Sequence, residues 1–353
     1  MKRLFSHFSI LPSALGLVTL LAVGATAQPA AAQPASGDLR IGIIGLDTSH
    51  VIAFSKIINA ENPPENIKGA KIVAAFPGGS PDLPSSADRI EGFTQQIRAM
   101  DIEIVDSIEE LLPKVDAVLL ESVDGRVHWE QIQPVIRAKK PVFVDKPIAA
   151  SLVDAIAILE YAKRQQVPIF SSSSSRFTPG YQEIVDDPKT GRVMGATVYG
   201  RTSVLPFHPD LFNYGIHGTE LLFTLMGEGC QSVRTVSTDG FDHVTGQWDS
   251  GRVGSYWAIK EPIAARLGAT VFGEKKTTYC DSYYDYKPLV NEIVQFFRTG
   301  EAPVPANETI EIVAFLTAAE QSKAENGATV QIKDVIEAAR TEALKKVEAA
   351  EAK

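Results

Sequence analysis

The chain has 353 residues, of which 44% are hydrophobic and 22% charged, and its formal net charge is −9. This length is typical of about two domains, and the composition indicates a globular protein and excludes a disordered or fibrous one. The negative charge argues against a nucleic-acid partner, because binding phosphates needs a basic surface. Cys230 and Cys280 are the only cysteines, which excludes a disulfide scaffold and a four-cysteine zinc site but leaves one bridge open.

The N-terminus has the pattern of a secretory signal peptide. A short basic start precedes a mostly apolar stretch over residues 8–23, and Ala25-Thr26-Ala27 provides a small-x-small cleavage pattern. The apolar stretch is shorter than the ~20 residues that a spanning helix needs. We therefore predict a signal peptide over residues 1–27, a linker over 28–37, export to the periplasm or the outside of the cell, and no further membrane contact.

Strands and helices alternate over residues 38–170. The predicted strands span residues 41–45, 71–76, 117–120, 142–144 and 167–170, and helices are predicted to start near residues 51, 107, 129 and 152. Apolar strands that alternate with helices form βαβ units and a parallel sheet. We predict an α/β fold that begins with a Rossmann-like, doubly wound parallel sheet, suited to binding a nucleotide.

The pattern changes after residue 170. The next predicted strands span residues 193–199, 231–237, 252–259 and 269–272, and helices are expected over 218–225, 289–298 and 310–321. Successive strands with short turns favour an antiparallel sheet. We predict a second, α+β open-sheet domain over residues 171–333, for substrate binding and oligomerisation, and a terminal helix over 334–353.

Four short motifs, met in this order, resemble those of the Gfo/Idh/MocA oxidoreductase family, which is named for glucose–fructose oxidoreductase, inositol dehydrogenase and a rhizopine-catabolism protein. They are His128 at the place of an Asn-x-x-His segment, Asp145-Lys146-Pro147 for Glu-Lys-Pro, Arg176-Phe177, and Asn213 to His217 for Asp-x-Gly-x-His. The resemblance spans residues 38–332. It implies NAD or NADP as cofactor, a sugar, polyol or related hydroxy compound as small-molecule substrate, and a homo-oligomer built on the open sheet.

The resemblance also implies where the site lies. Lys146 and His217 match the two residues that face substrate across the cofactor, where a proton leaves an alcohol as hydride leaves its carbon. Asn213 replaces an aspartate of the family. Its amide can orient a hydroxyl group but cannot act as a base. The expected catalytic residues are therefore Lys146, His217 and Asn213, with Asp124, Arg176 and His217 on the substrate side. The expected cofactor-binding residues are Gly45, Asp47, Thr48, Ser49, His50, Ser122, His128, Asp145 and Lys146.

Two departures from the dinucleotide fingerprint weaken the cofactor prediction. Only Gly45 of the expected Gly-x-Gly-x-x-Gly remains, and Asp47 puts a carboxylate where the pyrophosphate should pass. The second predicted strand ends near Pro77 without the acid that should accept from a ribose hydroxyl. We therefore expect free NAD(P) to bind weakly or in an unusual pose. Alternatively, Asp47, Thr48 or Ser49 only caps the following helix.

Two further alternatives stay open at the level of sequence. The same fold could serve a non-redox carbohydrate-directed lyase or hydrolase, or a binding protein, because fold alone does not determine function. Asp124 is either a turn residue before Gly125 or a ligand contact. No metal is expected, because the spacing of the set His208, Asp210, His217, Glu220 and His243 matches no metal-binding motif.

Overall fold

The computed structural model describes residues 38–203, 208–281 and 285–352. The predicted signal peptide and linker, residues 1–37, lie outside the described residues. None of the helices in the described part of the chain is long and apolar enough to span a membrane. Cys230 and Cys280 are both free, which answers the question of a bridge.

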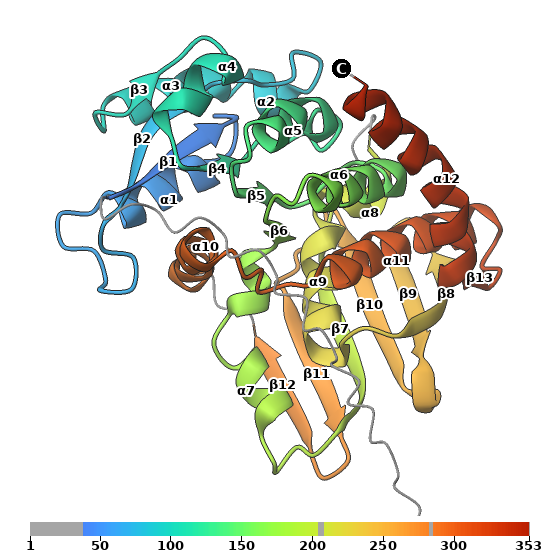
Figure 1. Ribbon diagram of the computed structural model, residues 1–353. Coiled ribbons are helices and arrows are strands. Elements are labelled where there is room, and N and C mark those ends of the chain that lie inside the picture. Colours follow the sequence, from blue (N-terminus) through green and yellow to red (C-terminus); the bar gives the residue numbers. More distant parts are fainter. Residues whose placement is uncertain (1–37, 204–207, 282–284, 353) are drawn as a thin grey trace, which may run out of the picture. The chain divides into compact units, whose positions relative to one another are not determined.

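The first sheet has six parallel strands in the order β3-β2-β1-β4-β5-β6 (Figure 1). Its strands are β1 (Leu39–Ile44), β2 (Ala70–Phe76), β3 (Glu103–Ile104), β4 (Ala117–Leu120), β5 (Val142–Asp145) and β6 (Ile169–Ser172). Its helices are α1 (Ser49–Ile58), α2 (Pro84–Ala87), α3 (Ile90–Arg98), α4 (Ile108–Leu111), the 3₁₀ turn η1 (Leu112–Lys114), α5 (His128–Arg137) and α6 (Leu152–Arg164). This strand order is that of a doubly wound dinucleotide-binding sheet, so the predicted Rossmann-like fold is confirmed.

The central strands are buried on both faces, which explains their continuous apolar sequences. All residues of β4 and β5 are buried, including Asp145 at the end of β5. A parallel sheet covered by helices on both sides needs such strands. Ser107 caps α4, near the predicted helix start, with its hydroxyl accepting from the backbone N–H of Glu110 at 3.1 Å. The carboxyl ends of the strands meet at one edge of the sheet, where open α/β sheets bind ligands.

The second sheet has seven strands in the order β12-β11-β7-β10-β9-β8-β13. They are β7 (Val193–Thr202), β8 (Cys230–Ser237), β9 (Phe241–Trp248), β10 (Val253–Lys260), β11 (Gly268–Gly273), β12 (Thr277–Asp281) and β13 (Val330–Gln331). The remaining helices are η2 (Ser174–Phe177), α7 (Tyr181–Asp186), α8 (Asp210–Asn213), α9 (Gly215–Met226), η3 (Asp249–Gly251), α10 (Lys287–Thr299), α11 (Ala306–Ala324) and α12 (Ile332–Glu351). The prediction omitted β9, β12 and β13.

The prediction of an antiparallel second sheet is wrong for one pair, because β7 and β10 run parallel. The reason lies in the connection between β7 and β8, which contains α8 and α9 and therefore crosses over the sheet. The antiparallel meander β8-β9-β10 then returns β10 to the side of β7 in the same direction. A mixed sheet is the consequence, and the rest of the α+β prediction is confirmed.

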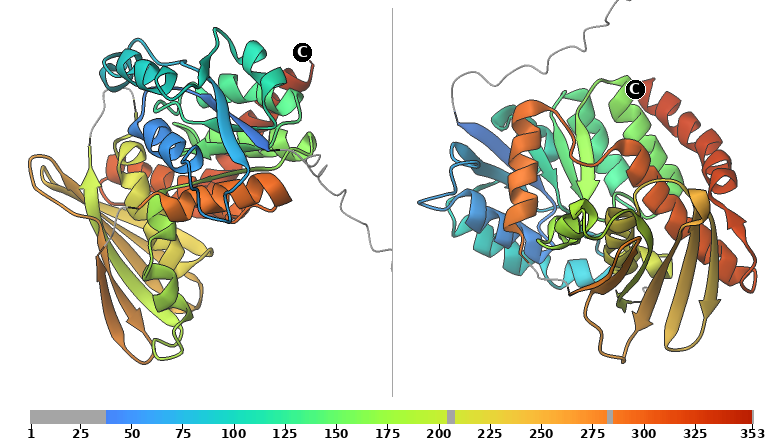
Figure 2. Two further views of the ribbon diagram at one scale, coloured as in Figure 1. Left: turned by 90° about the vertical axis from the view of Figure 1, so that its left-hand side faces the viewer. Right: turned by 90° about the horizontal axis from the view of Figure 1, so that it is seen from below.

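The helices lie on one face of the second sheet (Figure 2). Gly218 of α9 permits close packing, because a Cβ there would stand only 2.2 Å from the ring of Tyr256 in β10. The opposite face is open: Trp257 and Phe272 are 39% and 45% exposed, and strand register places them on the same side of the sheet.

Helix α10 lies far along the sequence but packs on the first sheet, beside α1 (Figure 1). Its apolar residues Leu289 and Ile293 share one core cluster with Ile41 of β1 and Phe170 of β6. This packing brings Tyr286, the residue before α10, against His50 of α1, with ring centroids 4.9 Å apart. A segment far beyond residue 170 therefore shapes the carboxyl edge of the first sheet.

Candidate active site

A cavity of about 620 Å³ lies where residues from the carboxyl edge of the first sheet meet residues of the second sheet and α9. This volume is that of a typical small-molecule site. Its lining includes six residues expected from the sequence: Thr48, Ser49 and His50 from the turn into α1, Lys146 after β5, and Asn213 and His217 from the fourth motif. The other lining residues are Ser85, Arg89, Val123, Ser174, Arg201, Ser203, Tyr214, Gly218, Glu261, Ala265, Leu267 and Tyr286.

The turn between β1 and α1 keeps the geometry of a phosphate-binding turn. Gly45 has a φ of +89°, and a Cβ there would lie 2.4 Å from the backbone nitrogen of Ser122, so only glycine fits. Thr48 is the N-cap of α1, and its hydroxyl accepts from the backbone N–H of His50 at 3.4 Å. Of the capping alternatives, Thr48 is therefore the residue that caps the helix.

Asp47 does not face the cavity, which corrects the prediction that its carboxylate lies in the path of a pyrophosphate. The side chain is fully buried and accepts two hydrogen bonds, from the Ser86 hydroxyl at 2.6 Å and from the Val123 backbone N–H at 2.9 Å. Burial raises the pKa of Asp47, although these two hydrogen bonds oppose the shift. Asp47 therefore joins the segment around α2 to the end of β4.

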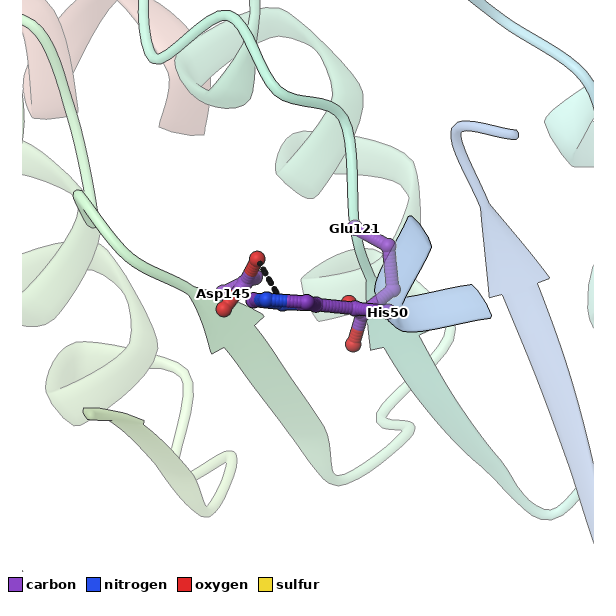
Figure 3. A group of neighbouring side chains, drawn as sticks. All are labelled: His50, Glu121 and Asp145. Atoms are coloured by element: carbon purple, nitrogen blue, oxygen red, sulfur yellow. Dashed lines mark hydrogen bonds and ion pairs between the residues drawn. The ribbon is translucent and has the colours of Figure 1, made fainter. Parts of the chain in front are cut away.

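His50, Asp145 and Glu121 form a buried group, of which His50 lines the cavity (Figure 3). The Nδ1 atom of His50 lies 2.8 Å from Oδ2 of Asp145, which ends β5. Burial alone would raise the pKa of Asp145, but His50 and Lys146 outweigh it, and the pKa is lowered. Glu121, directly after β4, is fully buried, and burial followed by the charge of Asp145 raises its pKa well above the ordinary value.

The structure brings Lys146 and His217 to the same cavity, although they are distant in sequence. The Nζ atom of Lys146 lies 3.7 Å from Oδ2 of Asp145. His217, in the first turn of α9, has its Nδ1 atom 2.7 Å from the hydroxyl oxygen of Ser173. Burial, and then the positive charge of Lys146, lowers the pKa of His217 well below its ordinary value, so its imidazole is neutral at neutral pH.

Asn213, expected among the catalytic residues, also lines the cavity, and its side-chain amide donates to the Ser203 hydroxyl at 2.5 Å. Next to it, Tyr214 carries the guanidinium of Arg201 over its ring at 4.1 Å from the centroid. Ser171 to Ser175 are buried, and Ser173 and Ser175 both form hydrogen bonds with His217. Sequence reasoning missed Arg201, since nothing in β7 marks which residue ends at the cavity, and it missed Tyr214, which lies between Asn213 and His217 in the fourth motif.

Arg176 and Asp124, predicted on the substrate side, do not line the cavity. Arg176 is buried and bound to Glu220 and Glu308, at 2.7 and 2.6 Å. Asp124 is fully buried and pairs with Arg126 and His208. Burial favours a higher pKa for Asp124, but the hydrogen bonds from His208 and Arg126 lower it. Both side chains are held by internal partners, and apart from Arg126 these partners come from distant segments that local sequence does not indicate.

His128 and Ser122, predicted to touch the cofactor, are also held internally. The two ring nitrogens of His128 lie 3.0 Å from the carbonyl oxygen of Ile148 and 2.7 Å from that of Ser122. The Ser122 hydroxyl donates to the side chain of Gln131 at 2.8 Å. Both residues fix the loops around the edge of the sheet and do not line the cavity.

The residues present fit the phosphate-bearing part of a dinucleotide. The N-terminus of α1 presents Thr48 and Ser49 to the cavity, where a helix N-terminus attracts anions. Arg89 adds a positive charge to the same wall. At the end of β2, however, Phe76 is followed by Pro77, and the nearby carboxylate of Asp82 is bound to Arg126 at 2.9 Å. The ribose acid is therefore missing in the structure as in the sequence.

Residues 39–173 match the model of an oxidoreductase family with an NAD-binding Rossmann fold. The myo-inositol 2-dehydrogenase of Thermotoga maritima is 28% identical over 34% of this chain and 39% of that enzyme. The chain matches about two fifths to one half of the length of its curated relatives, between 39% and 54%.

Solved structures share the whole architecture. A probable dehydrogenase from Thermotoga maritima superposes with a TM-score of 0.70, at 20% identity, over 84% of this chain and 100% of that chain. The scyllo-inositol dehydrogenase of Lactobacillus casei, solved with NAD(H) and scyllo-inositol, gives a TM-score of 0.67, at 15% identity, over 84% of this chain and 99% of that chain. At this identity the superpositions show the fold. Together with the family match over residues 39–173, they confirm the resemblance to the Gfo/Idh/MocA oxidoreductase family and the nicotinamide cofactor class.

Proposed function

We propose that the protein is an NAD(P)-dependent oxidoreductase that oxidises a secondary alcohol of a cyclitol, sugar or related polyol. The observation that carries this proposal is the convergence of Lys146 and His217 on one cavity, beside the N-terminus of α1. The substrate class is supported by the names of the similar proteins, which are dehydrogenases of myo-inositol and scyllo-inositol. A bound nicotinamide would accept the hydride that leaves the carbinol carbon.

His217 is suited to accept the hydroxyl proton. Its depressed pKa keeps the imidazole neutral at neutral pH. When Nδ1 donates its proton to the Ser173 hydroxyl oxygen, Nε2 is left as the acceptor. Lys146 lies on the same cavity and supplies a positive charge toward the oxygen that loses its proton. Asn213 and Arg201 offer donors for further hydroxyl groups of a polyol.

The test is turnover of a panel of cyclitols, sugars and polyols with NAD and NADP. Lys146→Ala and His217→Ala should each lower turnover by ~10²–10⁴-fold. The double variant should lose little more than the worse single variant, because residues that act as one unit are not additive. His243→Ala is the matched control, since His243 stacks on Trp257 of the open sheet face, with ring centroids 4.1 Å apart, and does not line the cavity. Wild-type rates for both alanine variants would place the chemistry elsewhere.

A non-redox lyase or hydrolase is the second candidate. It is favoured by the pairing of His50 with Asp145 in the wall of the same cavity, because a histidine oriented by a carboxylate can transfer protons without a hydride acceptor. The absence of a ribose acid near Pro77 supports the same candidate. Turnover that needs His50 and proceeds in nucleotide-free protein would establish this function and exclude the first.

We also propose that the mature protein is exported and assembles with itself. Export rests on the signal-peptide pattern of residues 1–27, and N-terminal sequencing of protein from the native host should find a start near Gln28 or Gln33. Self-assembly rests on the open sheet face, where Trp257 and Phe272 are exposed. Trp257→Glu should then turn an oligomer into a smaller species in sedimentation, whereas an unchanged sedimentation coefficient would exclude this face as the interface.

A further inference from the structure

Three side chains that can ligate a metal meet beside the cavity, and no step of the proposed reaction uses them as a set. They are His50 from α1, Glu121 after β4 and Asp145 at the end of β5 (Figure 3). We propose that these three residues bind one divalent transition-metal ion. This proposal does not depend on the proposed oxidoreductase function.

The geometry of the group suits a metal site. One ring nitrogen of His50 and one carboxylate oxygen each of Glu121 and Asp145 all lie within 4.8 Å of one another. Bonds of ~2.0–2.2 Å to a zinc ion would bring such ligand atoms to within roughly 3–4 Å of one another. His50 Nδ1 and Asp145 Oδ2 are 2.8 Å apart, at hydrogen-bond distance, so an ion would replace the shared proton and these two atoms would move slightly apart. Small side-chain rotations would therefore complete the site.

The second observation is that three carboxylate oxygens of this group lack hydrogen-bond partners among the described residues. Glu121 is 0% exposed, and among the described residues neither of its oxygens has a hydrogen-bond partner. Asp145 is 2% exposed, and its Oδ1 atom also has no hydrogen-bond partner among the described residues. Buried polar atoms in folded proteins are nearly always paired, and each unpaired one costs about 1–3 kcal/mol. These oxygens point to a ligand that carries positive charge.

The charges in this region lead to the same conclusion. Asp47 adds a third buried carboxylate, and its charge raises the pKa of Glu121 further, after burial and after the larger effect of Asp145. The positive charge of Lys146 opposes this rise in the pKa of Glu121, and its Nζ atom lies 3.7 Å from Oδ2 of Asp145. A proton on Glu121 would remove one negative charge. A divalent ion would neutralise both Glu121 and Asp145 and use the unpaired oxygens as ligands.

The ligand set selects the class of ion. One imidazole and two carboxylates suit zinc, manganese or iron(II), whereas magnesium and calcium favour oxygen ligands alone and copper(I) favours sulfur. His50 and Lys146 both line the cavity, so an ion on His50 would lie at the cavity wall. An ion in that place could polarise a hydroxyl or water bound in the cavity.

The experiment uses untagged full-length protein that has been treated with a chelator, without nucleotide or substrate. Zn²⁺ and Mn²⁺ are titrated by calorimetry, and the metal retained after desalting is measured by mass spectrometry. We expect one ion per chain, and Glu121→Gln should weaken its binding by at least ~10²-fold, since even residues that only orient a ligand account for ~10–100-fold. Glu320→Gln is the control, because this half-buried glutamate instead accepts from the backbone N–H of Leu211.

Protons provide an independent readout. Metal ions displace protons from their ligands, so binding should release protons and become tighter as the pH rises from 5 to 8. Retention of less than a tenth of an ion per chain would overturn the proposal, and so would equal affinities of the wild type and Glu121→Gln. An infrared band of a neutral carboxyl that persists at saturating metal and vanishes in Glu121→Gln would show that a proton occupies the site.

Discussion

Two buried ionic groups in this chain have opposite characters. In the Arg176 cluster, the guanidinium of Arg176 contacts both Glu220 and Glu308, and the Ser172 hydroxyl also donates to Glu220 at 2.7 Å. At the carboxyl edge of the first sheet, the second group contains Glu121 and Asp145, and Glu121 contacts no partner among the described residues. The first group is internally complete, and the second is not.

The difference separates structural charges from functional ones. A buried ion pair whose members satisfy each other holds two elements in register, here η2 against α9 and α11, and it needs nothing further. A buried carboxylate without a partner lowers stability, and such groups concentrate at functional sites. The unpaired group lies beside the cavity, whereas Arg176 does not line it.

The largest effect is expected when the complete cluster is broken. Glu220→Gln removes the charge that Arg176 contacts through Nε, and a buried pair that loses one member costs about 3–5 kcal/mol of stability. Urea unfolding of the variant measures this loss. A change below about 1 kcal/mol would mean that Glu308 alone suffices for Arg176, and the contrast between the two groups would be weaker than the structure indicates.

Glu121→Gln should raise the stability of the metal-free protein, in contrast to Glu220→Gln, and the size of this effect should be intermediate. The pKa of Glu121 is raised in the folded state, so the folded state binds the extra proton. Its stabilising contribution is fully present below the unfolded pKa of about 4.3 and is lost as the pH rises through the folded pKa. The glutamine variant has no such loss. Its stability advantage over wild type should therefore grow from pH 5 to pH 7, by about 1–3 kcal/mol.

Urea unfolding at pH 5, 6 and 7 in the presence of a chelator checks this sign. Saturating metal should reverse it, because an ion that binds only the folded state stabilises the wild type more than a variant lacking a ligand. A stability difference that stays constant across these pH values would show that Glu121 does not titrate differently in the folded and unfolded states.

The fold was largely predictable from sequence, and the reasons are local. β4 and β5 are apolar runs, of which the first is followed by Glu121 and the second ends at Asp145. Parallel strands buried on both faces require such apolar runs. β9 was missed because its buried positions include Asp242, which pairs with Lys260 and Lys323 from distant segments. The parallel pairing of β7 with β10 depends on the crossover through α9, which local turn patterns cannot show.

The sequence predicted the site residues that belong to a family motif. It did not predict the residues whose role depends on buried contacts with distant segments. Lys146, His217 and Asn213 reach the cavity as the family motifs implied. Arg176 was misplaced because its two carboxylate partners come from other segments. Glu121 was missed, although an acid directly after the apolar run of β4, at the ligand-binding edge of a parallel sheet, was a usable signal.

The smallest effect concerns Asp47, a third carboxylate near the sheet edge that does have partners. Asp47→Ala leaves the Val123 N–H and the Ser86 hydroxyl without their acceptor and should cost about 1–2 kcal/mol. Asp47→Asn keeps the Val123 hydrogen bond and removes a charge whose pKa burial raises, so its stability should stay within about 0.5 kcal/mol of wild type. Hydrogen exchange should accelerate around α2 in the alanine variant alone, because Ser86 joins that segment to Asp47.

Since the carboxylate of Asp47 faces away from the cavity, neither variant should tighten NAD binding. A large gain in NAD affinity in Asp47→Asn would show instead that its charge acts on the pyrophosphate path and would group Asp47 with the unpaired carboxylates.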